Sequence, residues 1–231
     1  MKLLFYLISL NIIYSQGIPY FSEKRAINLL YEQCDFGPRH PGSIGHEKMK
    51  IYLKNFLTPL CDSLFVMHEV AKNPFDDEIM KLTNFFARYN INAPFRFIIM
   101  AHWDSREYAD KDPTLSNRKL PVIGANDGAS GVAIILSLAE ILSKHPVLNI
   151  GIDLLLVDGE DQGVSGNSES FGIGTQLFSK HIPNPRPEFA ICLDMVADTE
   201  QHFLMEQFSL MQAPNIVEEI WTLANDLGYF Q

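Results

Sequence analysis

Three apolar segments, each followed at once by acidic or histidine side chains, constrain this chain more than any other feature. FRFIIMA (residues 95–101) precedes HWD, IGIDLLLV (150–157) precedes DGED, and FAICL (189–193) precedes Asp194. Uninterrupted apolar runs of this length are typical of parallel strands that helices cover on both faces. Residues 129–142, between the first two segments, carry an apolar stripe of helical period. This alternation of strand and helix predicts an α/β domain.

The chain before these segments predicts two more helices and two more strands. The helices are expected at residues 22–30, with Ser22 as the amino-terminal cap, and at residues 46–57. The strands are expected at residues 64–70 and 82–89. The stretch CDFGPRHPGSIGHEK is rich in glycine and proline and predicts a loop. A length of 231 residues suits one domain or at most two small ones.

Polar side chains gather just beyond the carboxyl ends of the three apolar strands. In open α/β sheets, ligand sites lie outside these ends. Side chains far apart in the sequence are therefore expected to converge, namely His102, Asp104, Glu160, Asp161 and Asp194. Asp127, in GANDGASG before the long helix, either adds a carboxylate near the positive end of that helix or merely caps it.

These side chains are of the types that bind zinc. Zn²⁺ takes histidine nitrogen and carboxylate oxygen, and a catalytic site leaves one position for water or substrate. The set could hold one zinc ion, or two ions bridged by a shared carboxylate as in aminopeptidases. Glu160 and Asp161 are adjacent on a turn, so their side chains diverge. One of them can bind the metal while the other carries protons.

Composition excludes some functional classes. Apolar residues make up 47% of the chain and charged residues 20%, which is typical of a globular protein with a sizeable core. The formal net charge of −10 leaves no basic surface of the kind that binds nucleic acid. An acidic chain is compatible with a site for cations.

The first residues resemble a secretory signal peptide. Lys2 is followed by an apolar run over residues 3–14, and Ser15 is a small residue at a plausible cleavage point. The run is too short to span a bilayer comfortably. We therefore expect residues 1–15 to be a signal, the mature chain to be secreted or periplasmic, and no membrane attachment after cleavage. A buried amino-terminal strand or helix is the alternative.

Cysteines and the other histidines give weaker expectations. Cys192 lies in an apolar strand and is expected in the core, whereas Cys34 and Cys61 could pair after export. No cysteine spacing matches a zinc framework. The histidines before and between the motifs are expected at the solvated surface: His40, His46, His68, His145 and His181. The first two, in the glycine-rich loop, could instead lie near a substrate.

Taken together, the motifs resemble those of a known family. AHWDSR, PVIGANDGASGVA, LLLVDGED and LDMVAD, in this order and spacing, are similar to the co-catalytic zinc aminopeptidases. Within that family, FGPRHPGSIGH also resembles the glutaminyl-peptide cyclotransferase (glutaminyl cyclase) branch of bacterial type. The resemblance covers residues 20–231 as one catalytic domain. It implies a mixed, mostly parallel central sheet flanked by helices in three layers, like that of zinc exopeptidases.

The resemblance also implies which residues bind the metal. His102 and Asp194 correspond to ligands of one metal position, and Asp161 corresponds to a ligand of the other. Asp127 corresponds to the carboxylate that bridges the two positions. Glutaminyl cyclases usually hold a single zinc ion, through the positions of Asp127 and Asp161 together with a later histidine.

Two further residues receive roles from the resemblance. Glu160 corresponds to the general acid and base, and Asp104 corresponds to a residue that orients the imidazole of His102. Trp103 either shapes the pocket or belongs to the core or a lid.

This sequence departs from the family pattern in two ways. Position 161 is Asp where many relatives have Glu, and the shorter side chain still supplies oxygen. The family normally continues with a DDH segment and a histidine ligand in a WHT-like or YHT-like motif, and neither occurs before Gln231. His202, the one histidine after Asp194, lies in EQHFLM, which matches neither motif. The chain is therefore expected to be incomplete at its carboxyl end.

Three functions fit these features. A glutaminyl cyclase would cyclise the amino-terminal glutamine of a peptide, and an aminopeptidase would hydrolyse the first peptide bond. The partners of either enzyme are peptides with a free amino terminus. The third alternative is a non-catalytic binding ectodomain on an enzyme fold. The loop, HWDS and LDM motifs favour the cyclase, and Glu160 disfavours the non-catalytic alternative.

Overall fold

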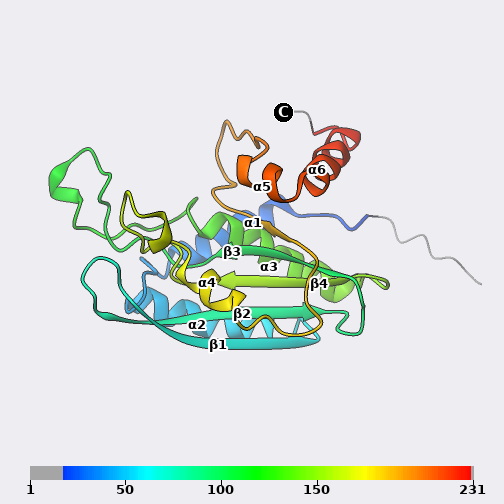
Figure 1. Cartoon of the computed structure of the whole chain (residues 1–231), viewed down its shortest axis with the longest axis horizontal. Helices are drawn as coiled ribbons and strands as arrows, with labels where there is room; N and C mark the ends of the chain where they lie inside the picture. Colours follow the sequence, from blue (N-terminus) through cyan, green and yellow to red (C-terminus); the bar gives the residue numbers. More distant parts are fainter. Residues whose placement is uncertain (1–17, 230–231) are drawn as a thin grey trace, which may run out of the picture. The chain divides into compact units, whose positions relative to one another are not determined.

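The computed structural model describes residues 18–229, which divide into two compact units (Figure 1). The first unit runs to Asp194 and the second begins at Met195. The second unit contains α5 (Gln207–Gln212) and α6 (Pro214–Asp226). Residues 1–15, the predicted signal, lie outside the described residues.

The first unit contains the predicted helices and strands, with ends shifted by a few residues. Its longer helices are α1 (Glu23–Cys34), α2 (Ile44–Leu57) and α3 (Ala129–Lys144). Its strands are β1 (Ser63–Lys72), β2 (Ile79–Tyr89), β3 (Arg96–His102), β4 (Gly151–Val157) and β5 (Ala190–Cys192). A short helix that the sequence does not predict is α4 (Ile173–Ser179), and 3-10 turns occur at η1 (Leu115–Asn117) and η2 (Ser168–Ser170). Ser22 caps α1 as predicted, by accepting a hydrogen bond from the backbone N–H of Arg25.

The strands form one mixed sheet in the order β1-β2-β4-β3-β5. β3 pairs in parallel with β4 on one side and with β5 on the other. β2 pairs antiparallel with both β1 and β4, so it alone runs against the other strands. The carboxyl ends of β3, β4 and β5 therefore lie together at one edge of the sheet.

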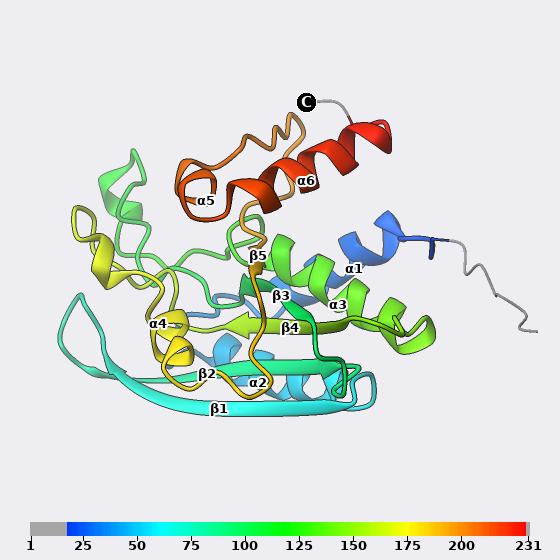
Figure 2. The ribbon, with the colours of Figure 1, turned by 45° about the vertical axis from the view of Figure 1, so that its right-hand side comes forward.

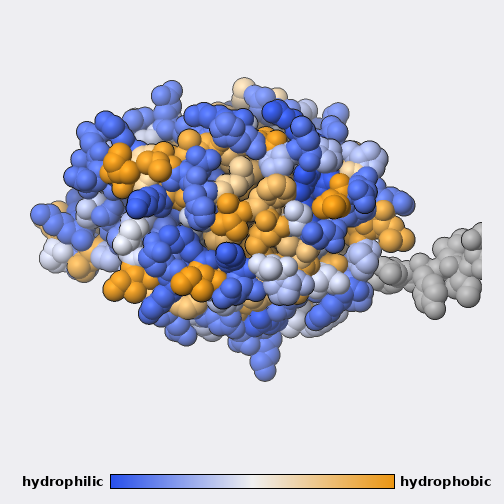
Figure 3. All heavy atoms as spheres, turned by 90° about the horizontal axis from the view of Figure 1, so that it is seen from below, coloured by the Kyte–Doolittle hydropathy of each residue, from blue (hydrophilic) through white to orange (hydrophobic). Residues whose placement is uncertain are grey.

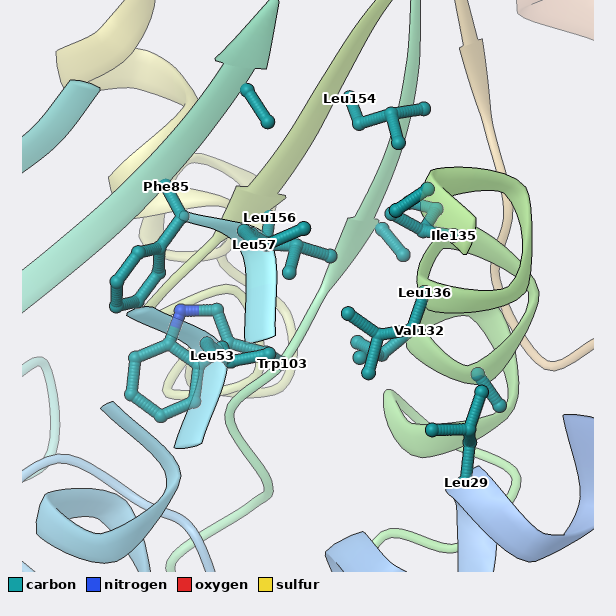
Figure 4. Close-up of a cluster of buried hydrophobic side chains, with 14 of the residues drawn as sticks. Leu29, Leu53, Leu57, Phe85, Trp103, Val132, Ile135, Leu136, Leu154 and Leu156 are labelled. Carbon is teal, nitrogen blue, oxygen red and sulfur yellow. The ribbon is translucent and has the colours of Figure 1, made fainter. Parts of the chain in front are cut away.

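Helices cover both faces of this sheet (Figures 1 and 2). Leu154 and Leu156 of β4 point into a core that is shared with α1, α2 and α3 (Figure 4). Leu155 and Val157, the alternate residues of the same strand, point to the opposite face and pack with Phe178 of α4. A strand buried on both faces is apolar at almost every position, which explains the apolar run in the sequence, and Asp153 is the charged exception. The three-layer α/β fold with a mixed sheet is confirmed.

Trp103 belongs to the core and not to a pocket. It is fully buried, and its indole N–H donates a 3.0 Å hydrogen bond to the carbonyl oxygen of Thr83 (Figure 4). The ring of His46 stacks on it at 4.6 Å between centroids. The prediction that His46 is solvated is wrong: it is fully buried, and its Nε2 lies 2.8 Å from Oδ2 of the buried Asp158.

A buried charge network crosses the sheet at the end away from the polar motifs. Asp153 of β4 is fully buried between two buried guanidinium groups, those of Arg88 on β2 and Arg96 on β3. Nε of Arg96 donates to Oδ2 of Asp153 at 2.8 Å, and Nε of Arg88 donates to Oδ1 at 3.1 Å. One carboxylate thus compensates two cations in the core and ties three adjacent strands.

The cysteines are free thiols, and Cys34 and Cys61 are each partly buried. The prediction that Cys192 lies in the core is wrong, because it is exposed on β5, the short outermost strand of the sheet.

Hydrophobic residues also occur at the surface, in groups among hydrophilic residues on the face drawn in Figure 3. Among the described residues, no helix is long and apolar enough to cross a membrane.

The buried charge network around Asp153 predicts a large loss of stability when that carboxylate is neutralised. Asp153→Asn leaves Arg88 and Arg96 buried without their counter-charge, and removing one partner of a buried ion pair costs about 3–5 kcal/mol. We expect the free energy of unfolding, measured by urea denaturation, to fall by about that amount. Asp77→Asn, at an exposed position, is the matched control and should change it by less than about 0.5 kcal/mol. An equal effect of both substitutions would contradict this account.

Candidate metal centre

Three side chains from separate segments meet at the edge of the sheet where β3, β4 and β5 end. His102 is the last residue of β3, Asp194 follows β5, and Asp127 precedes α3. Nε2 of His102 lies 2.9 Å from Oδ1 of Asp127 and 3.5 Å from Oδ1 of Asp194. One ligand atom from each residue lies within 4.8 Å of the other two. We call His102, Asp127 and Asp194 the ligand trio.

Two glycines allow the start of α3 to approach the strand ends this closely. Gly128 follows Asp127 with φ +95°, and a Cβ there would lie 3.1 Å from Cε1 of His102. A Cβ on Gly131 would lie 2.4 Å from the carbonyl oxygen of Leu193. Any side chain at these positions would therefore push α3 away from the ends of β3 and β5 and separate the members of the trio.

Asp104 connects the end of β3 to the turn after β4. Its fully buried carboxylate accepts hydrogen bonds from the backbone N–H groups of Glu160 and Asp161, at 3.0 and 3.2 Å, and from Nε2 of Gln162 at 2.9 Å. Oδ1 of Asp104 also lies 3.5 Å from Nδ1 of His102. This placement suits the role predicted for Asp104, which is to orient the imidazole.

The pKa values of His102 and Asp104 reflect two opposing effects, burial and nearby opposite charge. Burial alone would lower the pKa of His102, but the carboxylates of Asp104, Asp127 and Asp194 raise it well above its usual value. Burial likewise opposes the charge of Asp104, yet its contact with His102 and its hydrogen bonds lower its pKa. The charged forms of this pair therefore stabilise each other.

Glu160 lies beside the trio and outside it. Burial raises its pKa to about 7, and the negative charges of Asp104, Asp194 and Asp127 add to the rise, against the opposing effect of His102. At neutral pH this carboxyl group can therefore both accept and donate a proton.

A hollow of ≈ 560 Å³ opens beside these groups and suits a substrate. Glu160, His102 and Asp194 all border it, whereas the ≈ 360 Å³ hollow at the other end of the sheet touches none of them. The rest of its lining is mainly apolar or small, from β3, β4, β5, α4 and the chain before α4: Met100, Val157, Phe171, Gly172, Thr175, Gln176, Ser179 and Cys192.

Asp161 has a different neighbour in this structure. Its Oδ1 accepts a 3.0 Å hydrogen bond from Nη1 of Arg106, a guanidinium that is also paired with Asp110 at 2.8 Å. Burial raises the pKa of Asp161 to about 7, and the charges of Asp127 and Asp104 add to this effect. The structure thus does not bring Asp161 into the trio, and its predicted role as a ligand stays a prediction.

The residues of the trio fit a zinc ion. One imidazole and two carboxylates are the donor types that Zn²⁺ prefers, and three protein ligands are usual in catalytic sites. Among residues 18–229, neither ring nitrogen of His102 has a hydrogen-bond partner of good geometry, although carboxylates lie within 3.5 Å of both. A divalent cation between Nε2 and the two carboxylates would satisfy all three donors.

The sequence did not reveal the contacts of three polar residues that adjoin the segments carrying the site. Arg106 directly follows the HWDS motif, and its positive charge was the one hint that it pairs with a carboxylate, which is Asp161. His46 lies in register with Met49 and Leu53 on the apolar face of α2, a periodicity that would have predicted its burial. Arg39, buried in the glycine-rich loop, gave no signal beyond its position between glycines and prolines.

Solved bacterial structures are similar to this chain over most of its length. A glutaminyl cyclase of Bacteroides thetaiotaomicron, solved with bound N-acetylhistamine, is 31% identical with a TM-score of 0.87, and the match covers 92% of this chain and 75% of that one. A Zn-dependent exopeptidase of Parabacteroides distasonis is 34% identical with a TM-score of 0.87, over 92% and 75% of the two chains. A leucine aminopeptidase precursor of Bacteroides thetaiotaomicron is 31% identical with a TM-score of 0.87, over 92% and 76%.

The sequence itself matches a family pattern. No curated protein matches the chain. Residues 84–230, which are more than half of the sequence, match Peptidase family M28. The matched stretch contains His102, Asp127, Asp194 and the turn with Glu160. Together with the similarity to solved glutaminyl cyclases and zinc exopeptidases, this match shows that the chain belongs to Peptidase family M28.

Proposed function

We propose that this chain is a zinc-dependent glutaminyl-peptide cyclotransferase, which converts the amino-terminal glutamine of a peptide to pyroglutamate and releases ammonia. The observation that carries the proposal is the position of Glu160, which borders the same hollow as His102 and Asp194 but lies outside the trio. A carboxylate placed in this way can exchange protons with a substrate held at the metal. Family membership supports a zinc enzyme that acts on peptides, and the similarity to the Bacteroides cyclase supports the choice of cyclisation.

The second candidate is a zinc aminopeptidase. The similarity to a leucine aminopeptidase precursor and to a Zn-dependent exopeptidase favours it. Both reactions need a Lewis acid beside a proton carrier, and they differ in the nucleophile. The peptidase uses water, whereas the cyclase uses the amine of its own substrate. The resemblance of FGPRHPGSIGH to the cyclase branch leads us to place the cyclase first.

His102, Asp127 and Asp194 would hold one zinc ion. Asp127 and Asp161 would serve the other metal position, the one that the resemblance assigns to the single ion of glutaminyl cyclases, so the chain has ligands for one or two ions. A bound zinc ion supplies a Lewis acid that polarises the carbonyl group under attack. Asp104 accepts hydrogen bonds from the backbone of the turn after β4, and its Oδ1, 3.5 Å from Nδ1 of His102, would orient the imidazole.

Glu160 carries the protons of the reaction. The α-amine nitrogen attacks the side-chain amide carbon of the glutamine, and Glu160 accepts a proton from that nitrogen as the ring C–N bond forms. Glu160 then donates the proton to the side-chain nitrogen, the original C–N bond breaks and ammonia leaves. The same group acts as base and then as acid, and its position beside the hollow, outside the trio, leaves its carboxylate oxygens to the substrate.

The substrates of this enzyme would be peptides with a free amino terminus. The apolar run and small residue within residues 1–15 support an exported enzyme, either secreted or periplasmic, that meets such peptides outside the cytoplasm.

The choice between the two reactions predicts distinct products. The purified chain with zinc should release ammonia from a Gln-initiated peptide and leave a Leu-initiated peptide intact, as followed by mass spectrometry. Release of free leucine would instead establish the aminopeptidase. If the zinc-bound chain changes neither peptide, the proposal of catalysis fails and a binding role becomes the better account.

The proton-transfer role predicts a loss of rate without a loss of metal. Glu160→Gln keeps the shape of the side chain but cannot exchange protons, so kcat should fall by about 10²–10⁴-fold. Zinc content, measured by atomic absorption, should stay the same because Glu160 lies outside the trio. Glu169→Gln, on the exposed η2 turn, is the matched control and should keep the rate. An unchanged kcat in Glu160→Gln would remove this residue from the mechanism.

The ligand trio predicts that removing one of its carboxylates weakens zinc binding. Asp127→Ala removes the carboxylate nearest to Nε2 of His102 and should weaken zinc binding by more than about 100-fold, because losing a group that only orients a ligand already costs about 10–100-fold. Competition with a chromophoric chelator measures this affinity. Asp226→Ala, which removes an exposed carboxylate on α6, should leave it unchanged. Equal affinities in the two variants would show that the metal binds elsewhere.

A further inference from the structure

Arg39 lies in the loop between α1 and α2, and its guanidinium group is fully buried. Its side-chain N–H groups donate hydrogen bonds to backbone carbonyl oxygens. Nη1 donates to Ile123 and Nη2 to Gly124, both at 2.8 Å, and Nε donates to Trp103 at 3.2 Å. Longer contacts of 3.5 Å join Nη1 to the carbonyl oxygens of Gln33 and Gly37.

These carbonyl groups belong to the two segments that carry trio residues. Trp103 directly follows His102, whereas Ile123 and Gly124 lie just before Asp127. The ligand atoms of His102 and Asp127 are 2.9 Å apart although their segments are distant in the sequence. The guanidinium group of Arg39 therefore bridges the two segments whose ligand atoms must converge on one ion.

The backbone of Arg39 adds a second connection between the same segments. Its N–H donates a 2.9 Å hydrogen bond to Oγ of Ser105, which in turn donates to the carbonyl oxygen of Val122 at 2.9 Å. The carbonyl of Gly124 also accepts from the backbone N–H of Ala129, at the start of α3. Arg39 is thus linked to the strand end, to the loop before Asp127 and, through that loop, to α3.

We infer that Arg39 is a positioning residue of the metal centre, which holds the segments of His102 and Asp127 so that their ligand atoms face one ion. The inference rests on the proposed zinc function, and it assigns Arg39 no contact with metal or substrate. Ligand atoms in a metal site must lie within a few tenths of an ångström of their ideal distances, so the segments that carry them have to be fixed.

The chemistry of the guanidinium explains why this position needs arginine. Its planar fork presents several N–H donors in different directions, so three carbonyl groups on two segments can each receive one. A lysine at position 39 has donors on one atom only and cannot span the same carbonyls. The carbonyl dipoles also compensate the positive charge, which would otherwise be costly to bury.

A buried arginine elsewhere in the fold provides a matched control. Arg96 is also fully buried, but it donates to Asp153 and to the carbonyls of Ala93 and Tyr89, at the opposite end of β3 from His102. Arg39→Lys and Arg96→Lys make the same chemical change in the same degree of burial. Only the hydrogen bonds of Arg39 reach the segments that carry His102 and Asp127.

The test measures the zinc affinity of the full chain by competition with a chelator, and the visible absorption spectrum of the Co²⁺-substituted protein. Arg39→Lys should weaken zinc binding by about 10–100-fold and change the Co²⁺ spectrum, because the ligands lose their fixed arrangement. Arg96→Lys should lower the melting temperature and leave both metal readouts as in the wild type. A folded Arg39→Lys variant with wild-type zinc affinity would overturn the inference, and so would an equal loss of affinity in Arg96→Lys.

A milder variant keeps the test decisive if Arg39→Lys does not fold. Ser105→Ala retains the guanidinium and removes only the hydroxyl between the Arg39 backbone and Val122. It should weaken zinc binding several-fold and shift the Co²⁺ spectrum in the same sense. Wild-type values for both readouts in Ser105→Ala would then overturn the inference.

The affinity readout also separates this inference from the proposed function. If the wild-type chain binds zinc but cyclises no peptide, the cyclase proposal fails and the affinity ratio still decides the role of Arg39. If the wild-type chain binds no zinc, both fail together.

Discussion

The parallel pairing of β3 with β4 and β5 is the constraint on which the site depends. Parallel strands that start at one edge must all end at the other, so His102, the turn with Glu160 and Asp194 arrive at the same place. α3 lies between β3 and β4 in the chain, and a helical crossover of this kind lets two strands of one sheet run in the same direction. The candidate metal centre is therefore a consequence of strand order, and the loop before α3 adds Asp127 because Gly128 and Gly131 permit close approach.

Negative charge concentrates around His102 at this edge. The carboxylates of Asp104, Asp127 and Asp194 surround the imidazole, and burial together with the same negative charges raises the pKa of Glu160. Asp104 is fully buried, whereas the side chains of Asp127 and Asp194 are 43% and 52% exposed, so water screens part of their repulsion. A divalent ion among these groups would relieve the rest, so the electrostatics of the trio are compatible with metal binding.

The convergence of the site could be predicted because it follows from local patterns. The strands that precede His102 and Glu160 are recognisable from their apolar runs alone. Because ligands in open α/β sheets bind outside the carboxyl ends of the strands, these runs also predict where the site lies. The partners of individual side chains could not be predicted in this way. Asp161 pairs with Arg106, and the donors of Arg39 reach carbonyls of distant segments, because tertiary packing decides which groups meet. Backbone carbonyls in particular leave no trace in a sequence.

The pairing of Asp161 with Arg106 bears on which metal position this chain can fill. Oδ1 of Asp161 accepts from Arg106, whereas His102, Asp127 and Asp194 are grouped closely enough to share one ion. The resemblance places the single ion of glutaminyl cyclases at the other position, through Asp127 and Asp161 with a later histidine. Either reaction needs a Lewis acid beside a proton carrier, and the trio with Glu160 offers both. The arrangement of charges therefore supports a zinc enzyme, and the choice of the cyclase rests on the sequence motifs.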